Sequence, residues 1–257
     1  MLEKFRKAKE AEIDALKRNG VPPPFSGSRP GFSSAFKGDG IAVIAEYKRA
    51  SPSRGVICES VEVDDAARQY AASGASALSI LTEREWFGGD LAYIARAART
   101  GLPVLRKDFI FDEIQVRESA ATPAAAILLI VRQTPDPTRL RALRESAESF
   151  GMEAVVEIFD AREAEIARKS GATLIQVNAR DLQKLAVDRR GVFTVIAQAQ
   201  KEAGETWIAA SGIETGAHLQ EAEQAGFDAA LVGTALMRRA TPGPALEALL
   251  KDYREHG

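Results

Sequence analysis

Along most of the chain, short blocks of apolar residues are separated by longer blocks that mix apolar and polar residues. Eight short apolar segments recur, at residues 41–47, 77–82, 102–107, 126–131, 154–158, 173–178, 207–211 and 229–233. They are nearly continuous in apolar residues and do not alternate apolar with polar. This pattern is typical of parallel strands that are covered on both faces.

The segments between these strands have the spacing of amphipathic helices, for example "VDDAARQYAAS" and "AREAEIARKS". Most end at a glycine just before the next strand, namely Gly74, Gly101, Gly151, Gly171 and Gly226. A left-handed residue at a helix C-terminus is usually glycine, which has no Cβ to clash. Eight such units predict a (β/α)8 barrel, and a doubly wound open sheet is the alternative because it has the same joints.

Residues 1–40 lie outside this repeat. A charged amphipathic helix precedes "VPPPFSGSRPGFSSAF", whose prolines and glycines exclude regular structure, although Phe25, Phe32 and Phe36 are too apolar for a free linker. We expect an N-terminal helical extension, residues 1–40, packed on a single catalytic barrel domain, residues 41–257. Two placements are open: a helix that plugs the bottom of the barrel, or an arm that crosses its top and covers a site.

Composition narrows the partners. A net charge of −2 and a pI of about 5.9 give no sign of a nucleic-acid partner or an anionic membrane. No apolar run approaches the roughly 20 residues of a membrane helix, and the N-terminus is too charged for a signal peptide. A single cysteine, Cys58, fits a reducing compartment. We expect a cytoplasmic protein that is a monomer or a weak homo-oligomer.

Polar residues gather where the predicted strands end. The first strand ends in Glu46 and Lys48, which share a face because they are two residues apart. The third, fifth and sixth strands end at Lys107, Glu157 and Asn178. The carboxyl ends of all barrel strands meet at one mouth, so these groups should converge. Clustered charges shift each other's pKa, as acid–base catalysis requires.

The last two strands end in a different pattern. "SGIETG" and "VGTALM" each place glycine beside a hydroxyl residue before a helix, at Ser211, Gly212, Gly233 and Thr234. Free N–H groups at a helix start bind phosphate, and this pair of loops is the usual phosphate site of the fold. The ligand should be a phosphorylated small molecule.

Several chemistries find no support. The two histidines are His218, within a helix, and His256, in the tail, and no spacing suits zinc or a serine triad. No G-x-G-x-x-G follows the first strand. Nothing supplies a base to make Cys58 a nucleophile. Proton transfer should rest on lysine and glutamate, with no metal and no cofactor.

These residues lie within motifs that resemble one family. "IAEYKRASPSRG", "SILTEREWFGG", "LPVLRKDFI", "ILLIV", "VEIFD", "QVNARDL", "ASGI" and "LVGTALMR" resemble, in order and spacing, indole-3-glycerol-phosphate synthase of tryptophan biosynthesis. The resemblance runs from about residue 1 to 250 and includes an N-terminal extension that helps cover the barrel mouth. It implies a lyase acting on 1-(o-carboxyphenylamino)-1-deoxyribulose 5-phosphate, which loses CO2 and water as the pyrrole ring closes.

The resemblance also implies a division of labour. Lys107 matches the general acid that protonates the sugar carbonyl as the aromatic carbon attacks it. Lys48 matches the lysine that holds substrate and assists proton transfer, and Glu157 matches the base of the later steps. Glu46 and Asn178 match groups that orient the lysines and the substrate hydroxyls.

Substrate contacts carry over by motif as well. The resemblance places polar contacts at Ser51 and Arg180, ring contacts at Phe87, Phe109 and Leu129 or Val131, and phosphate contacts at Ser211, Gly212, Gly233 and Thr234.

One position departs from the family pattern. The family usually has glutamate before Ser-Gly-Ile, where this chain has Ala210. Two alternatives therefore stay open. One is a related phosphosugar barrel such as phosphoribosylanthranilate isomerase, although that family has cysteine and aspartate where this chain has Glu46 and Asn178. The other is a non-catalytic barrel that binds phosphate or a partner protein.

Overall fold

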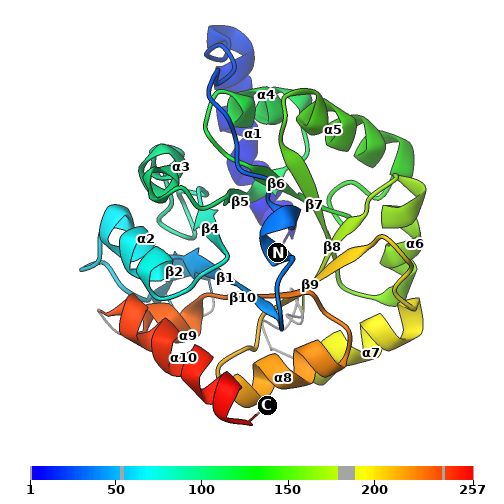
Figure 1. The fold of residues 1–257 in the computed structure, drawn as a ribbon. Helices are drawn as coiled ribbons and strands as arrows, with labels where there is room; N and C mark the ends of the chain where they lie inside the picture. Colours follow the sequence, from blue (N-terminus) through cyan, green and yellow to red (C-terminus); the bar gives the residue numbers. More distant parts are fainter. Residues whose placement is uncertain (1, 53–54, 179–188, 239–240, 257) are drawn as a thin grey trace.

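The computed structural model describes residues 2–52, 55–178, 189–238 and 241–256. Eight parallel strands close into a barrel in the order β1, β4, β5, β6, β7, β8, β9, β10, with β10 paired to β1 (Figure 1). The predicted (β/α)8 barrel is confirmed, and the open sheet is excluded. The barrel strands are β1 (Ala42–Tyr47), β4 (Ala77–Leu81), β5 (Val104–Ile110), β6 (Ala126–Ile130), β7 (Glu153–Ile158), β8 (Leu174–Asn178), β9 (Thr206–Ala210) and β10 (Ala229–Val232).

Helices surround the barrel (Figure 1). They are α1 (Leu2–Asn19), η1 (Ser33–Phe36), α2 (Val63–Ala72), α3 (Ala92–Ala97), η2 (Ala98–Thr100), α4 (Glu113–Ala120), α5 (Pro137–Ser149), α6 (Ala161–Lys169), α7 (Arg189–Ala199), α8 (Gly216–Gln224), α9 (Thr234–Met237) and α10 (Pro242–His256). All five glycines predicted at helix–strand joints have positive φ, between +74° and +95°. The local joints of the repeat were thus predicted correctly.

Two features near the strand ends were not predicted. Strand β5 runs on to Ile110, three residues past its expected end. Its pairing with β6 shifts register, since Arg106 pairs with Ile127 and Ile110 with Leu129. A short antiparallel hairpin, β2 (Ala50–Ser51) with β3 (Gly55–Val56), follows β1. Both features lie beside the carboxyl ends of the strands.

The barrel wall separates two apolar clusters. One fills the interior with alternate strand residues such as Ile44, Leu105 and Val155. The other packs the outer face of the strands against the helices. Apolar contact on both faces explains why the strands read as continuous apolar runs.

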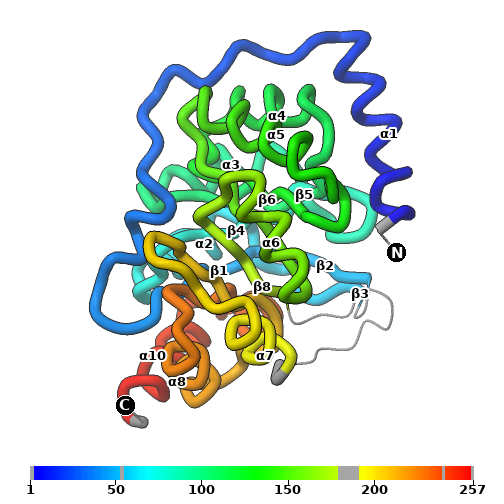
Figure 2. The backbone as a smooth tube through the Cα atoms, turned by 90° about the vertical axis from the view of Figure 1, so that its right-hand side faces the viewer, coloured from blue at the N-terminus to red at the C-terminus, as the bar shows by residue number. Residues whose placement is uncertain are grey.

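The N-terminal extension reaches both ends of the barrel. Figure 2 shows α1 at one end, and the blue segment after it passing along the outside to the other end. There, Phe32 and Phe36 of the η1 region are buried against the interior cluster. The Phe32 and Ser33 N–H groups donate to Glu153 at the start of β7. The plug and the cover are therefore separate parts of one extension, and the plug is η1 rather than the helix.

Arg29 fastens the same segment to the bottom of the barrel. Its guanidinium donates to four backbone carbonyls, those of Ala120, Thr122, Ala124 and Phe150. These carbonyls follow α4 or α5 or lie at their ends, where helical partners are missing.

Among the helices that the structure describes, none combines the length and the apolar character that a membrane span requires.

Candidate active site

A cavity of about 400 Å³ opens at the carboxyl ends of the strands. It brings together most of the residues predicted for the site: Glu46, Lys48, Ser51, Phe87, Lys107, Phe109, Glu157, Asn178, Ser211, Gly212, Gly233 and Thr234. Val131 does not line it, and Arg180 lies outside the described residues. The expected convergence at one mouth is therefore seen in the geometry.

The charged centre of the cavity joins β1 to β5. The Lys48 ammonium donates to Glu46 Oε1 at 2.7 Å, and the Lys107 ammonium lies 3.8 Å from Glu46 Oε2. Glu46 and Lys48 are 3% and 9% exposed. One carboxylate thus faces two ammonium groups in a site largely closed to water, where charge interactions are stronger than at a surface.

Glu157 enters from the opposite side, on β7. Its Oε2 accepts hydrogen bonds from the amides of Gln176 and Asn178, the latter at 3.1 Å. Burial raises the pKa of Glu157, and the Lys107 ammonium and the two amides oppose this rise without cancelling it. A carboxyl with a raised pKa can both take and return a proton near neutral pH. Gln176 was not anticipated from the sequence because it lies below the strand end.

Alternate strands β1, β5, β7 and β9 each send one side chain into the cavity at this level. Three are Glu46, Lys107 and Glu157, and the fourth is Ala210, which is 2% exposed. Barrel interiors are built in such sets of four from alternate strands. The departure from the family pattern therefore falls inside the charged centre rather than at its rim.

The two predicted phosphate loops lie next to this centre. Ser211 and Gly212 have consecutive positive φ values of +72° and +82°, and the Ser211 hydroxyl donates to Asn178 Oδ1 at 2.9 Å. A serine in the left-handed region is strained, and such strain gathers at functional sites. A turn of this kind directs successive N–H groups at an anion.

Gly233 makes a second connection between the loops and the charged centre. A Cβ added there would lie 2.4 Å from Glu46 Oε1 and 3.1 Å from Glu46 Cβ. Real Cβ atoms do not approach so closely. The Glu46 carboxylate therefore fits here because Gly233 has no side chain. The sequence suggested a phosphate role for this glycine and gave no signal for its contact with Glu46.

An aromatic wall closes one side of the cavity. Phe5 of α1 stacks on Phe109 with ring centroids 4.2 Å apart and planes 13° apart. Phe87 lies 6.1 Å from both rings. Phe5 also lines the cavity, so α1 contributes directly to the site. Phe5 was missed because the helical pattern of residues 1–19 does not tell which apolar residue reaches the mouth.

Val131 is the predicted site residue, among those that the structure describes, that does not line the cavity. It is 1% exposed and packs in the cluster between the barrel wall and the helices, as does its alternative Leu129. Leu128 and Ile130 line the cavity instead. Successive strand residues point to opposite faces, so an error of one residue reverses the side.

His218 also lines the cavity, from α8. Its Nδ1 accepts a hydrogen bond from the Glu214 N–H at 3.1 Å.

Among the residues that the structure describes, no group of three or more His, Cys, Asp or Glu side chains could hold a metal ion.

A closed barrel with acid–base groups and phosphate-type loops at the carboxyl ends of its strands defines a (β/α)8-barrel enzyme site. The chain belongs to the indole-3-glycerol phosphate synthase family, whose sequence model matches residues 6–249. A relative from Desulfotalea psychrophila named indole-3-glycerol phosphate synthase is 39% identical over 97% of this chain and 98% of its own length. One from Streptomyces coelicolor, named indole-3-glycerol phosphate synthase 2, is 41% identical over 85% of this chain and 84% of its own length.

Solved structures show the fold more broadly. The 3-hexulose-6-phosphate synthase of Salmonella typhimurium aligns with a TM-score of 0.66 and 13% identity, over 84% of this chain and all of its own. A thiamine phosphate pyrophosphorylase from Pyrococcus furiosus aligns with a TM-score of 0.60 and 17% identity, over 84% of this chain and 96% of its own length. At such identities the likeness concerns the barrel architecture alone.

Proposed function

We propose that this protein is an indole-3-glycerol-phosphate synthase. It closes the pyrrole ring of 1-(o-carboxyphenylamino)-1-deoxyribulose 5-phosphate, with loss of CO2 and water, in tryptophan biosynthesis. The observation that carries the proposal is the meeting of Glu46, Lys48, Lys107, Glu157 and Asn178 in one cavity of a chain of this family. The membership of the family gives the substrate, and the cavity supplies groups for each proton transfer.

The first step forms the carbon–carbon bond. The ring carbon that carries the carboxylate attacks the sugar carbonyl carbon, and Lys107 gives a proton to the carbonyl oxygen. The Glu46 carboxylate lies 3.8 Å from the Lys107 ammonium that gives this proton. The carboxylate then leaves as CO2, and its bonding electrons restore the aromatic ring.

The second step removes water. The hydroxyl formed from the carbonyl leaves as water with a proton from the Lys48 ammonium, and Glu157 takes a proton from the neighbouring substrate carbon, so that the ring double bond forms. Its buried position and raised pKa fit a group that binds this proton and then releases it. Lys48 holds the substrate and assists proton transfer. Asn178, whose amide also donates to Glu157 Oε2, orients the substrate hydroxyls, and Glu46 orients the lysines.

The substrate fits the cavity in two parts. The anthranilate ring has an apolar wall in Phe87, Phe109 and Phe5. The phosphate has the turns at Ser211, Gly212, Gly233 and Thr234, which line the same cavity. Ser51 and Arg180 are proposed for the remaining polar groups of the substrate.

The wider assignments stay proposals too. We infer that residues 1–40 act as an extension of a single catalytic domain, residues 41–257. A biosynthetic enzyme of this family would work in the cytoplasm on a small molecule. The state of a monomer or weak homo-oligomer remains a prediction.

The test is direct observation of the product. On addition of the substrate, indole fluorescence should appear with the wild-type chain. Lys107→Met should lower kcat by at least about 10²-fold, as expected for a lost general acid, with an unchanged circular dichroism spectrum. Substrate binding without product would instead favour the non-catalytic barrel that Ala210 makes conceivable. Near-normal turnover in Lys107→Met would refute the role of that lysine.

A further inference from the structure

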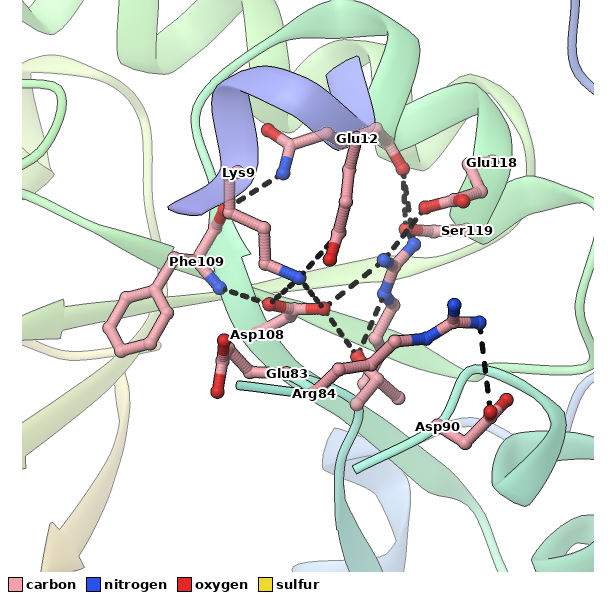
Figure 3. Close-up of polar contacts among 12 residues, drawn as sticks. Lys9, Glu12, Glu83, Arg84, Asp90, Asp108, Phe109, Glu118 and Ser119 are labelled. Carbon is pink, nitrogen blue, oxygen red and sulfur yellow. Dashed lines mark hydrogen bonds and ion pairs between the residues drawn. The ribbon is translucent and has the colours of Figure 1, made fainter. Parts of the chain in front are cut away.

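The end of β5 is held by a buried ionic cluster that starts in the N-terminal extension. Lys9 of α1 is 1% exposed, and its ammonium lies 2.8 Å from Asp108 Oδ1 and 2.8 Å from Glu12 Oε2. Figure 3 shows the Lys9 side chain reaching from α1 to Asp108, with Glu12 beside it. Asp108 is buried and pairs with a lysine 99 positions away in the sequence, a contact that no local pattern of the sequence predicts.

Asp108 has a full set of partners around its carboxylate. Thr82 donates to Oδ2 at 2.6 Å, Arg106 at 3.2 Å, and the Phe109 N–H donates to Oδ1 at 2.8 Å. Burial opposes its charged form, but Lys9 and Arg106 outweigh this and lower the pKa of Asp108. A buried carboxylate that loses such a partner becomes strongly unfavourable, so the local backbone depends on Lys9.

Arg106 carries the cluster on to α4. Its guanidinium contacts Glu118 at 2.8 Å and the Ser119 hydroxyl at 2.8 Å. Residues 106 and 108 are therefore both held in the same cluster, and Asp108 also borders the cavity. Lys107 stands between them and points inward.

The backbone at this point is irregular. Between its two pairs with β6, strand β5 spans four steps from Arg106 to Ile110, while β6 spans two from Ile127 to Leu129. Such bulges occur beside active sites, where they re-aim a side chain. The Lys107 ammonium lies 3.8 Å from Glu46, too far for a hydrogen bond. Its aim is therefore set mainly by the backbone that Arg106 and Asp108 hold.

We propose that Lys9 is a positioning residue for Lys107. By neutralising Asp108 it holds the bulged end of β5 in the form that directs Lys107 at the reacting carbonyl, and it seats Phe5 of the same helix on Phe109. The inference rests on the proposed function, because it concerns the group that acts as general acid there. The extension thus sets the geometry of proton transfer in addition to covering the mouth.

The decisive variant is Lys9→Met, which keeps the length of the side chain and removes its charge. kcat at saturating substrate should fall at least about tenfold, because a displaced general acid loses part of the 10²–10⁴-fold that such a group contributes. Lys9→Arg should recover part of kcat, since it restores a cation. Lys17→Met is the matched control, since Lys17 links the same helix to Asp112 at 2.8 Å but is 53% exposed and away from the cavity.

A merely structural role would give a different result. If Lys9 only anchors α1, Lys9→Met should lower the unfolding temperature and leave kcat of the folded protein unchanged, and this outcome would overturn the proposal. If the single variant does not fold, Lys9→Met/Asp108→Asn removes both members of the buried pair, and only the partly exposed Glu12 side chain loses its contact with Lys9. Because the amide needs no cation beside it, kcat of the double variant should be near that of wild type. A loss of kcat as large as the one expected for Lys9→Met would show that Lys9 does not act by neutralising Asp108, and would overturn the proposal.

A second readout separates this inference from the proposed function. Trp86 packs edge-on against Phe5, with centroids 6.1 Å apart and planes at 78°. Lys9→Met should shift the tryptophan emission to longer wavelength, because Phe5 would lose its contacts with Phe109 and Trp86 and leave Trp86 more exposed to water. Lys17→Met should not shift it. A wild-type chain that forms no indole would refute the function alone. An emission spectrum unchanged in Lys9→Met would refute the seating of α1, whether or not the chain is active.

Discussion

Strand β7 carries a glutamate at each end, and the two have opposite surroundings. Glu153, at the closed bottom, accepts hydrogen bonds from the Phe32 and Ser33 N–H groups of the extension. Glu157, at the mouth, is buried beside Glu46 and Lys107, and burial raises its pKa. The first carboxylate serves to hold the extension against the barrel. The buried surroundings of Glu157 disfavour its charged form. This lowers the stability of the folded protein but gives the site a carboxyl group that can exchange a proton.

The extension repeats this contrast. At the bottom it supplies Phe32, Phe36 and Arg29, all of which seal or fasten the barrel. At the mouth it supplies Phe5 and Lys9, which lie against the cavity and its supporting strand. Changes at the bottom should therefore mainly alter stability, and changes at the mouth should mainly alter chemistry.

The largest effect is expected at the plug. Phe32 is fully buried and packs edge-on against Phe36. Phe32→Ala should lower the free energy of unfolding by about 3–5 kcal/mol, the usual cost of truncating a buried phenylalanine, measured by urea titration. Turnover per folded molecule should stay normal. Val56→Ala is the control, since Val56 is 63% exposed; a reduced kcat in the folded Phe32 variant would break the contrast.

Gly233 should show the reverse behaviour. Gly233→Ala places a Cβ against Glu46 Oε1 and pushes the carboxylate away from Lys48 and Lys107. We expect kcat to fall by about 10²-fold, the lower end of the contribution of an acid–base group, with a smaller loss of stability. Gly38→Ala is the matched control, because an added Cβ there meets nothing within 4 Å. A rise in KM alone would show that Gly233 serves only the phosphate.

The two glutamates of β7 should respond to the same substitution with opposite signs. Glu153→Gln should lower the free energy of unfolding by about 1 kcal/mol, since hydrogen bonds to a charged group exceed those to a neutral one by about that amount. Glu157→Gln should raise stability at pH 7.5, because the amide needs no ionisation in the buried site. It should also abolish turnover if Glu157 is the base.

The pH dependence of this difference follows from the direction of the pKa shift. A folded-state pKa above the unfolded value means that protonated Glu157 favours folding. That contribution is full below the unfolded pKa of about 4.3 and is lost as pH rises through the folded-state pKa. The advantage of Glu157→Gln should therefore grow from pH 4 to pH 7.5 in urea titrations. A variant less stable than wild type at pH 7.5 would contradict this sign.

The sequence predicted the barrel because its signals are local. Each apolar run and each glycine joint, such as Gly151 before β7, depends on a few neighbouring residues. The charged centre was also predictable, since parallel strands end at one face and Glu46, Lys107 and Glu157 stand at those ends. No contact between distant residues was needed for either inference.

The failures concern contacts that local signals do not carry. Val131 was placed on the wrong side because the strand end was off by a single residue, and one residue reverses the face. The bulge of β5 exists only in its pairing with β6. The partner of Asp108 is Lys9, far away in sequence, and the helical pattern that contains Lys9 does not say which side meets the barrel.

The smallest effect is expected at Ala210, the one uncharged member of its set of four. Ala210→Glu adds a carboxylate to a cavity of about 400 Å³ that already holds Glu46 and Glu157. Those two raise the pKa of the new group, whereas Lys48 and Lys107 lower it. Because the cavity has space beside Ala210 and the two ammonium groups attract the new carboxylate, we expect the new group to fit. It should raise kcat severalfold and change the acidic limb of the pH profile as it titrates.

The variant Ala210→Gln separates proton handling from shape. It has the size of glutamate but neither takes nor gives a proton at these pH values, so it should leave kcat near or below that of wild type. If glutamine raises kcat as much as glutamate, the gain comes from filling space and not from chemistry. If Ala210→Glu folds stably with unchanged kcat and pH profile, the position is idle in this protein, and Glu46 and Glu157 suffice for the later proton transfers.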